Sequence, residues 1–372
     1  MSAKVTAAAS SRTMGAMVEF APTTSPIASV VVLAWKLSTP LVACLRSLRA
    51  SEIDGEFEVV IVLNGANAAT RSAVAQRVRG AKVVDLEANV GYGGGCNAGA
   101  LVATGKYIVL LNDDTLVERT WLSTLVTAAE TAPPGIGAVA SLLMNPDGTV
   151  QEAGSRVLRN AGTMAFGRGL TLAQAQHSGF LSRRPIDYGS GAALLMLRQT
   201  FVDVGGFDPL FEPAYFEDVD LCFRIRRAGF DVVLEPSAIV THISGGSTEG
   251  DRRFRDFAFE RSRSKFSSRW ATVLAHAPKA GAPVESLCDP QLIAEVPILV
   301  DRKSPDRIRP NTVALAIAQD YQAWLNERLD RIEANAELVT RRLADLENRG
   351  PIGILRWRVG LWLQRRREAR SA

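Results

Sequence analysis

KYIVLLNDDT, residues 106–115, is the stretch that decides the predicted fold of this chain. Its apolar run, 107–111, predicts a strand buried on both faces of a sheet, and the run ends abruptly in Asn112, Asp113 and Asp114. In an open α/β sheet, ligands bind beyond the carboxyl ends of the strands. The three polar side chains therefore have two interpretations: oxygen ligands for Mg²⁺ or Mn²⁺, or caps of a helix that begins near residues 117–118.

The residues before this strand alternate between two patterns. Apolar runs predict a buried strand at 28–35, a second strand at 57–63 and a third, short strand at 82–86. Between them, one helix is predicted to begin at residue 38 or 39 and another to run to about residue 79. The second strand ends at Asn64. Strands that alternate with helices predict a parallel, doubly wound α/β sheet.

A glycine-rich segment, NVGYGGGCNAG at residues 89–99, comes before the central strand. It lacks the Lys-Ser/Thr of a P-loop, and it follows the third strand rather than the first, so it is not a dinucleotide-binding fingerprint either. Gly91 and Gly95 would let the backbone approach a nucleoside closely, with Asn89 and Asn97 supplying hydrogen bonds. A flexible turn at a helix entry explains the same residues.

Beyond the central strand the pattern is looser. A strand is predicted at 136–144, followed by an Asn-Pro-Asp-Gly turn at 145–148. Residues 154–184 have little periodicity and predict a long loop over the acceptor side of the sheet. The next strand is predicted at 187–197, where Gly189-Ser190-Gly191 could pass close to a ligand.

Three acids gather at the start of the next predicted helix: Glu217, Asp218 and Asp220. The helix dipole favours carboxylates in a first turn, and this alone accounts for two of them. A carboxylate aimed at a cleft could instead act as a general base. The predicted helix buries Leu221, Ile225 and Ala228, and two apolar runs follow it, 230–234 and 239–242, the second ending in His242. A lone histidine is more often structural than a ligand, but this one ends a strand, as Asp114 does.

Taken in order, these motifs resemble glycosyltransferase family 2, and in particular its bacterial rhamnosyltransferase-like branch. The resemblance rests on NVGYGGGCNAG, LLNDDT, GSGAALLMLR, VGGFD, FEDVDLCFRIRRAG and the P-x-A-x-V-x-H of residues 236–242. It implies the GT-A fold, a doubly wound mixed α/β sheet with a Rossmann-like nucleotide-binding half and an acceptor half. It also implies inverting transfer of a sugar from a nucleotide-diphosphate sugar to a hydroxyl group.

The resemblance assigns roles residue by residue. The metal-binding DXD motif of the family matches residues 112–114, so that Asp114 takes the place of the second acid and Asn112 that of the first. His242 matches a histidine that similar enzymes use as a further metal ligand, with Mn²⁺ or Mg²⁺ as the ion. Asp218 matches the catalytic base, and Glu217 and Asp220 would support and orient it.

The nucleotide-sugar site is expected from Asn64, Asn89, Gly91, Gly95, Asn97 and Asp113. Two departures from the family pattern concern this site: the first strand ends in Trp35-Lys36, and the second ends in Asn64, where the family usually has an aspartate that contacts the base. An amide oxygen can still accept a hydrogen bond. A dTDP- or UDP-sugar is the expected donor, with dTDP-rhamnose favoured by the branch.

Composition excludes other classes of protein. Four scattered cysteines without CxxC spacing indicate neither a disulfide framework nor a zinc site, and a reducing cytoplasmic compartment fits best. No stretch approaches the roughly 20 apolar residues of a membrane span. The net charge of +4 belongs to the C-terminal tail, where residues 351–372 hold six arginines and one glutamate, so nucleic acid is not expected as a partner.

The C-terminal part of the sequence predicts an association element. A seam spaced by four and three residues runs through Leu325, Leu329, Ile332, Ala336, Val339, Leu343 and Leu346. This spacing is typical of a coiled coil and therefore of a homo-oligomer, although an amphipathic helix packed on the main domain has a similar pattern. Tryptophans and arginines in the basic tail are typical of an interfacial helix at an anionic membrane, although a solvated basic terminus is also basic.

The predicted organisation is a disordered leader (1–26), a GT-A domain (27–275), a linker (276–315), a coiled-coil helix (316–349) and a basic amphipathic tail (350–372). We expect a cytoplasmic, metal-dependent glycosyltransferase, peripheral at the inner face of the cell membrane, that acts on a cell-envelope glycan or its lipid-linked precursor. The first alternative is a catalytically silent GT-A-like module that binds nucleotide or glycan and acts through its coiled coil. The second, a nucleotidyltransferase, would need a basic Gly-rich loop after the first strand, and residues 34–38 do not form one.

Overall fold

The computed structural model describes residues 17–131, 135–243, 252–297 and 310–348. The chain separates into two compact units, Met1–Ala314 and Leu315–Ala372. The helices are α2 (Ser38–Arg49), α3 (Ala68–Arg77), α4 (Gly91–Val102), α5 (Trp121–Glu130), α6 (Leu172–His177), α7 (Arg198–Asp203), α8 (Glu217–Arg227), α9 (Arg252–Arg269), α10 (Ala271–His276), α11 (Pro290–Glu295) and α12 (Pro310–Asn348).

A mixed sheet with the strand order β12-β14-β8-β13-β6-β2-β3-β5 forms the centre of the first unit. Its strands are β2 (Ala28–Ala34), β3 (Phe57–Asn64), β5 (Lys82–Leu86), β6 (Tyr107–Asn112), β8 (Ile136–Met144), β12 (Arg184–Pro185), β13 (Ala193–Leu197) and β14 (Asp231–His242), with β7 (Thr115–Val117) and β9 (Val150–Glu152) at its margins. Two small ribbons pair β1 (Val18–Glu19) with β4 (Val78–Arg79) and β10 (Ser155–Val157) with β11 (Thr163–Ala165).

The direction of the strands decides which residues meet. β6, β2, β3 and β5 are parallel, so their carboxyl ends share one edge of the sheet. β13 is antiparallel to both β6 and β8, and β14 is parallel to β8. Two reversals return β8 and β14 to the direction of β6, and the carboxyl end of β14 therefore lies at the same edge. The predicted doubly wound mixed sheet is confirmed.

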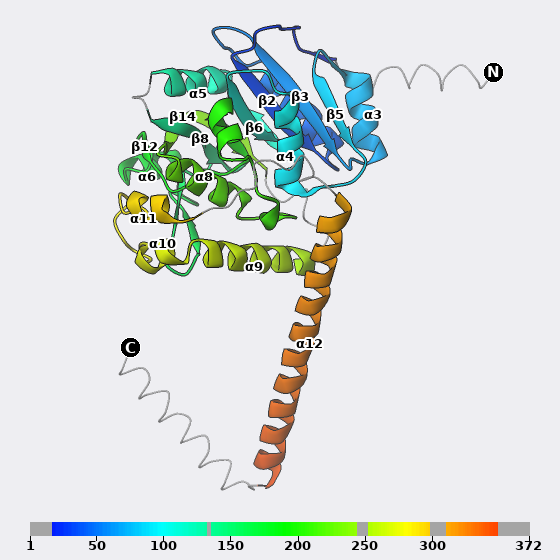
Figure 1. Ribbon diagram of the computed structural model, residues 1–372, viewed down its shortest axis with the longest axis vertical. Helices are drawn as coiled ribbons and strands as arrows, with labels where there is room; N and C mark the ends of the chain where they lie inside the picture. The colour runs from blue at the N-terminus through cyan, green and yellow to red at the C-terminus, as the bar shows by residue number, and fades with distance from the viewer. Residues whose placement is uncertain (1–16, 132–134, 244–251, 298–309, 349–372) are drawn as a thin grey trace, which may run out of the picture. The chain divides into compact units, whose positions relative to one another are not determined.

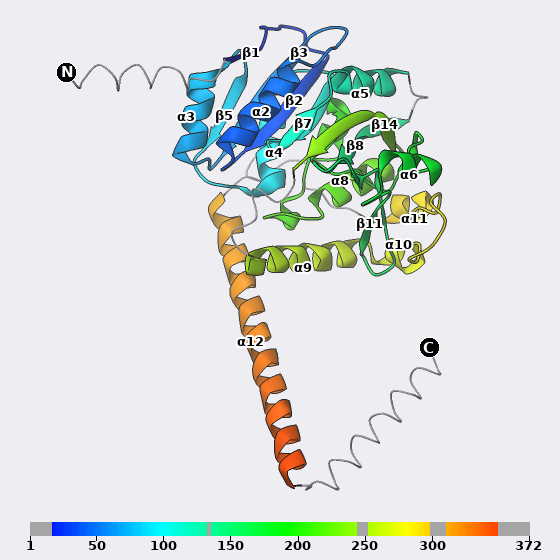
Figure 2. The same cartoon turned by 180° about the vertical axis from the view of Figure 1, so that it is seen from behind.

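Helices cover both faces of this sheet and create two buried clusters. One cluster joins alternate strand residues such as Val31 and Ile108 to α4 and α8, and the other joins Val30 and Val109 to α2 and α5. Figure 1 shows α4 and α8 on the near side of the sheet. Figure 2 shows the molecule from behind, and there α2 covers the opposite face of the sheet. Period-two alternation of apolar side chains on buried strands accounts for this division.

The glycine-rich segment opens a helix, as predicted, and most of its residues lie inside that helix, because α4 begins at Gly91. Glycine is a poor helix former, but tertiary packing overrides this preference here. A Cβ atom at Gly95 would lie 2.4 Å from Leu33 Cδ1, and one at Gly99 would lie 2.4 Å from Val31 Cγ1. The missing side chains therefore let α4 pack closely on β2.

Other boundaries also differ from the prediction. The expected long loop at 154–184 contains β10, β11, α6 and the start of β12. The predicted strand at 187–197 is regular only from Ala193, and the two apolar runs around residue 235 form one strand, β14, whose register shifts between Glu235 and Ile239. No helix begins near residue 117, because β7 precedes α5. Ala228, expected on the buried face of α8, is exposed.

The catalytic domain is longer than predicted at both ends. Val18 and Phe20 are buried, so the expected leader contributes to the core from residue 18, while residues 1–16 lie outside the described part of the chain. Beyond residue 275, α11 packs against α8. The buried Arg156 donates hydrogen bonds to the carbonyl oxygens of Ala282 and Pro283, at 2.8 and 2.7 Å. The first part of the expected linker is therefore folded against the domain.

The second unit consists, in its described residues, of one continuous helix, α12. Three residues of its apolar seam are exposed, with 57% of Leu329, 61% of Ile332 and 54% of Val339 accessible. The basic tail, 350–372, lies outside the described residues. Among the residues that the structure describes, no helix has the length and the apolar character needed to cross a bilayer.

Candidate active site

Three of the predicted metal ligands meet where β6 and β14 end. β7 pairs antiparallel with β14 in a register that places His242 opposite Thr115, and the backbone N–H of Ile243 donates to the carbonyl oxygen of Asp114 at 3.0 Å. His242 Nε2 then lies 3.2 Å from Asp114 Oδ1 and 3.4 Å from Asn112 Nδ2. Residues that are about 130 positions apart in the sequence thus form one corner of the sheet edge.

Buried carboxylate oxygens without a donor mark this edge. Asp113 Oδ2, Asp114 Oδ1 and Glu217 Oε2 have no hydrogen-bond partner among the described residues. An unpaired buried carboxylate oxygen is costly, so native proteins usually supply a donor or a cation. Burial, together with the charge of Asp114, raises the pKa of Asp113 to about 7. The edge is therefore built to receive positive charge or hydrogen-bond donors.

Gln151 contacts the Nδ1 side of the His242 ring, opposite the side that faces Asp114. Sequence reasoning did not identify this residue. Its Oε1 lies 2.7 Å from His242 Nδ1, and its Nε2 donates to the carbonyl oxygen of His242 at 3.1 Å. The residue lies on β9, directly after the Asn-Pro-Asp-Gly turn. A single glutamine after a turn carries no sequence signal of this role, because the contact depends on how β9 and β14 are brought together.

The predicted base, Asp218, lies in the first turn of α8. The helix follows two residues with left-handed backbone, Tyr215 (φ 73°) and Phe216 (φ 65°). Asp218 Oδ1 accepts a hydrogen bond from the N–H of Val219 at 2.8 Å, and its Oδ2 accepts one from the N–H of Gly191 at 3.1 Å. Burial raises the pKa of Asp218 despite these N–H donors, and burial and the charge of Asp218 raise that of Glu217.

The loop before β13 joins Asp218 to the predicted metal corner, which is formed by Asn112, Asp114 and His242. Gly191 holds Asp218, and the carbonyl oxygen of the next residue, Ala192, accepts a hydrogen bond from the N–H of Asn112 at 3.0 Å. Tyr92, in the first turn of α4, donates its hydroxyl proton to the carbonyl oxygen of Gly191 at 2.7 Å. The irregular residues that replace the predicted strand at 187–192 are thus the connection between the two parts of the site.

Glu152 is a second residue that the sequence did not reveal. It is 7% exposed, and its Oε1 accepts a hydrogen bond from the N–H of Ser190 at 3.0 Å, next to the Gly191 N–H that holds Asp218. Burial and the charge of Asp218 raise the pKa of Glu152 to about 7. The consecutive N–H groups of Ser190 and Gly191 therefore hold the carboxyl groups of Glu152 and Asp218, whose negative charges would repel each other.

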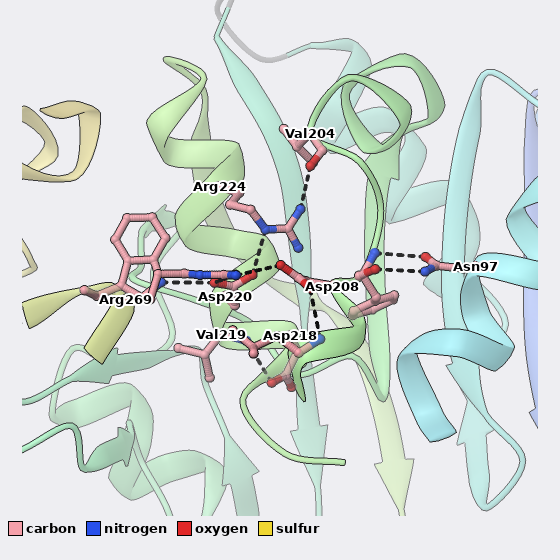
Figure 3. A network of polar contacts seen from close by, with 11 residues as sticks. Asn97, Val204, Asp208, Asp218, Val219, Asp220, Arg224 and Arg269 are labelled. Carbon is pink, nitrogen blue, oxygen red and sulfur yellow. Dashed lines mark hydrogen bonds and ion pairs between the residues drawn. The ribbon is translucent and has the colours of Figure 1, made fainter. Parts of the chain in front are cut away.

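Asp220 is engaged in a buried network of hydrogen bonds. It is fully buried and accepts hydrogen bonds from Arg224 Nε at 2.7 Å, Arg269 Nη1 at 2.9 Å and Trp270 Nε1 at 3.0 Å. Figure 3 shows Asp220 and Asp208 beside the guanidinium group of Arg269, which also donates to Asp208 at 2.7 Å. This network joins the start of α8 to the end of α9.

Three asparagines expected at the nucleotide are engaged within the protein. Asn64 Oδ1 accepts from the N–H of Val90 at 2.9 Å, and its Nδ2 donates to the carbonyl oxygen of Gly91 at 2.9 Å. Asn89 Oδ1 caps the N–H of Gly91 at 2.9 Å. Asn97 exchanges two hydrogen bonds of 2.9 Å with the backbone of Phe207, as Figure 3 shows at its right side. These amides hold the turn before α4 and the Gly205-Gly206 loop in place.

Comparison with known proteins agrees with the fold. Residues 29–187 match the family model described as glycosyl transferase family 2. N-acetylglucosaminyl-diphospho-decaprenol L-rhamnosyltransferase of Mycobacterium tuberculosis (strain H37Rv) is 30% identical over 228 residues, which is 55% of this chain and 73% of that protein. A mixed α/β sheet with acids at its carboxyl edge is typical of enzymes that use nucleotide sugars. The chain belongs to glycosyltransferase family 2.

Other similarities are more distant or cover less. The uncharacterized protein y4gI of Sinorhizobium fredii is 29% identical over 67% of this chain, but the chain spans only 28% of that protein. A solved structure, the mannosyltransferase PcManGT of Pyrobaculum calidifontis in complex with GDP-Man and Mn²⁺, has a TM-score of 0.46 at 18% identity and covers 87% of this chain and 85% of its own.

The raised pKa of Glu152 makes a prediction about stability. The protonated carboxyl favours the folded state below its ordinary pKa of 4.5, and this contribution is lost as the pH rises through about 7. Glu152→Gln removes the titration, so between about pH 5 and about pH 8 the variant should gain on the order of 1–3 kcal/mol relative to the parent. Urea denaturation at both pH values measures the difference.

Glu130→Gln provides the control without a pH effect in this window. The salt bridge to Lys106 lowers the pKa of Glu130 below its ordinary 4.5, so its contribution is complete above about pH 4.5, and the small stability difference of this variant should be the same at both pH values. The effect should be small because Glu130 is 40% exposed. A stability difference for Glu152→Gln that does not change with pH would contradict the interpretation of Glu152.

Proposed function

We propose that this chain is an inverting, metal-dependent glycosyltransferase that moves a sugar from a nucleotide-diphosphate sugar to a hydroxyl of a cell-envelope glycan or a lipid-linked glycan precursor. The main support is that Asp218 and the Asn112–Asp114–His242 corner are joined through Gly191 and Ala192. A base and a site for the leaving diphosphate are the two requirements of attack on an anomeric carbon.

The donor set at the corner fits a divalent cation. Asp114 offers an unpartnered carboxylate oxygen, His242 a ring nitrogen and Asn112 an amide. Within the described residues no cluster of three His, Cys, Asp or Glu side chains has metal-binding geometry, so the protein would supply few charged ligands. This suits Mg²⁺ or Mn²⁺, which complete their octahedral shells with water and substrate phosphates. The ion would neutralise charge on the departing diphosphate.

Asp218 would take the proton from the acceptor hydroxyl as its oxygen attacks the anomeric carbon. The N–H groups of Val219 and Gly191 fix the direction of this carboxylate. A raised pKa brings a carboxylate closer to the operating pH and makes it a more effective proton acceptor. Glu217, whose pKa is raised by burial and by Asp218, would remain protonated beside it and add no second negative charge at the acceptor.

The identity of the donor and acceptor is proposed from the relative in Mycobacterium tuberculosis, whose name describes an L-rhamnosyltransferase acting on a diphospho-decaprenol lipid. We favour a dTDP- or UDP-sugar, rhamnose among them, and a lipid-linked acceptor. The protein would then be cytoplasmic and peripheral at the membrane, with the basic tail at the lipid surface. The exposed seam of α12 would join copies of the chain in a coiled coil.

The first test is a thermal-shift panel of UDP, dTDP, GDP and CMP, each with Mn²⁺, Mg²⁺ or a chelator. A ligand at 100 times its dissociation constant stabilises the folded state by about 2.7 kcal/mol. We expect one nucleotide to raise the melting temperature only with metal, and Asp114→Ala to abolish this shift because it removes the charged ligand. Asp203→Asn, on the exposed part of α7, is the control.

An equal shift with metal and with chelator would contradict metal dependence. No shift with any nucleotide would favour the catalytically silent module over the enzyme.

The second test concerns the base. Asp218→Asn keeps the shape of the side chain but cannot take a proton, so release of nucleoside diphosphate from the donor should fall by about 10²–10⁴-fold. Nucleotide affinity, measured by calorimetry, should stay within about twofold because the metal corner is intact. Turnover like that of the parent would exclude Asp218 as the base, and loss of nucleotide affinity would mean that it acts on the donor site.

The third test concerns the C-terminal unit. Deleting residues 318–372 should reduce the molar mass of the assembly in light scattering, and it should reduce recovery with anionic vesicles, without lowering the melting temperature of the catalytic domain. Ile332→Glu places a charge in the seam, so it should dissociate the assembly and leave recovery with vesicles unchanged. Ala334→Glu lies off the seam and should not dissociate the assembly. A monomeric parent that does not bind vesicles would contradict both proposals.

A further inference from the structure

The tautomer of His242 decides what its side chain can do at the metal corner. A neutral imidazole carries one proton, and the nitrogen without the proton is the one that can bind a cation. In His242, Nδ1 faces Gln151 and Nε2 faces Asp114 and Asn112. The proton must therefore be on Nδ1 if Nε2 is to act as a ligand.

A chain of hydrogen bonds fixes the direction of the Gln151 amide. The Thr149 hydroxyl donates to the Asp147 carboxylate at 2.7 Å, and its oxygen accepts from Asn145 Nδ2 at 2.9 Å. Asn145 must then turn its Oδ1 to Gln151, whose Nε2 donates to it at 3.0 Å. A carboxylate is only an acceptor when it is ionised, so each later member of the chain has one allowed orientation.

A second anchor gives the same result independently. Gln151 Nε2 also donates to the carbonyl oxygen of His242 at 3.1 Å, and a carbonyl can only accept. With both amide protons used in this way, Gln151 Oε1 is the atom that faces His242 Nδ1 at 2.7 Å. An oxygen at that distance needs a proton on Nδ1.

The surroundings of Nε2, on the opposite side of the ring, are consistent with a nitrogen that carries no proton. The Nδ2 atom of Asn112, a donor, lies 3.4 Å from Nε2. Asp114 Oδ1 lies 3.2 Å from the same nitrogen and still has no hydrogen bond. If Nε2 carried a proton, that proton would face the N–H donor of Asn112.

We propose that Gln151 is a positioning residue that holds His242 in the Nδ1-protonated tautomer and so directs the Nε2 lone pair to the space beside Asp114, where a divalent cation would bind. The inference rests on the proposed metal site for its purpose, but the tautomer itself does not require a metal. β9 carries Gln151 to His242 because it pairs with β8, and β8 runs beside β14. Hydrogen-bond partners behind a metal-binding histidine commonly orient it in this way.

The experiment measures the tautomer in the metal-free, full-length protein. With ¹⁵N-labelled histidine the chain gives only three imidazole spin systems, from residues 177, 242 and 276, and His242→Gln assigns the one of interest. In the parent we expect His242 to be protonated at Nδ1. Gln151→Met has a similar shape without the acceptor and should shift His242 to a mixture of tautomers, whereas Gln151→Glu restores an acceptor and should restore the Nδ1 proton.

Manganese binding, followed by electron paramagnetic resonance of Mn²⁺ added alone, gives the second readout. Gln151→Met should weaken binding by about 10-fold, as is usual for partners behind a metal ligand. Gln199→Met makes the same change on an exposed helix and should alter neither readout. If Gln151→Met acted only by disturbing the structure, Gln151→Glu would not reverse its effect. Signals other than those of His242 would then change as well.

The outcomes separate this inference from the proposed function. His242 protonated at Nε2 in the parent, or an unchanged tautomer in Gln151→Met, would overturn the role of Gln151 whatever the affinity for Mn²⁺. The expected tautomers in a parent that does not bind Mn²⁺ would support the role of Gln151 in positioning the ring and would overturn the metal-dependent part of the proposed function.

Discussion

The antiparallel register between β7 and β14 is the constraint on which the site depends. It places His242 opposite Thr115, and the N–H of Ile243 on the carbonyl oxygen of Asp114. A slip by one residue would turn His242 to the other face of the sheet. The register is held in turn by the pairing of β14 with β8 and by the burial of Val117 and Val240. The chemistry of the corner is thus a consequence of strand pairing.

Buried polar groups divide into two kinds in this protein. Asp220 and Arg156 have several partners each, and they join α8 to α9 and residues 282–286 to the core. A buried charge of this kind is tolerated because its hydrogen bonds replace water. The carboxylate oxygens of Asp113, Asp114 and Glu217 lack such partners. We propose that these three acids, unlike Asp220, are available to a ligand.

Much of the sheet could be predicted from the sequence. The runs at 57–63, 82–86 and 136–144 became strands with the same or nearly the same limits. Apolar runs such as 57–63 and 136–144 fit strands buried on both faces, whereas 82–86 lies at the edge of the sheet and is largely exposed. The helix entry at the glycine-rich segment was predicted, but not that the glycines themselves are helical, since this depends on close packing against Leu33 and Val31. The short strands between residues 154 and 185 have too few residues to show a period.

The sequence by itself determined the family, the fold class and the residue types of the candidate site, because a motif such as LLNDDT combines a buried strand with polar residues at its end. Tertiary structure alone decided which residues meet. Gln151 and Glu152, adjacent on β9, contact His242 and the Ser190-Gly191 loop respectively, and the amides of Asn64 and Asn97 are taken up by backbone partners. The physical reason is that hydrogen bonds between distant segments depend on strand register and burial, which no local pattern encodes.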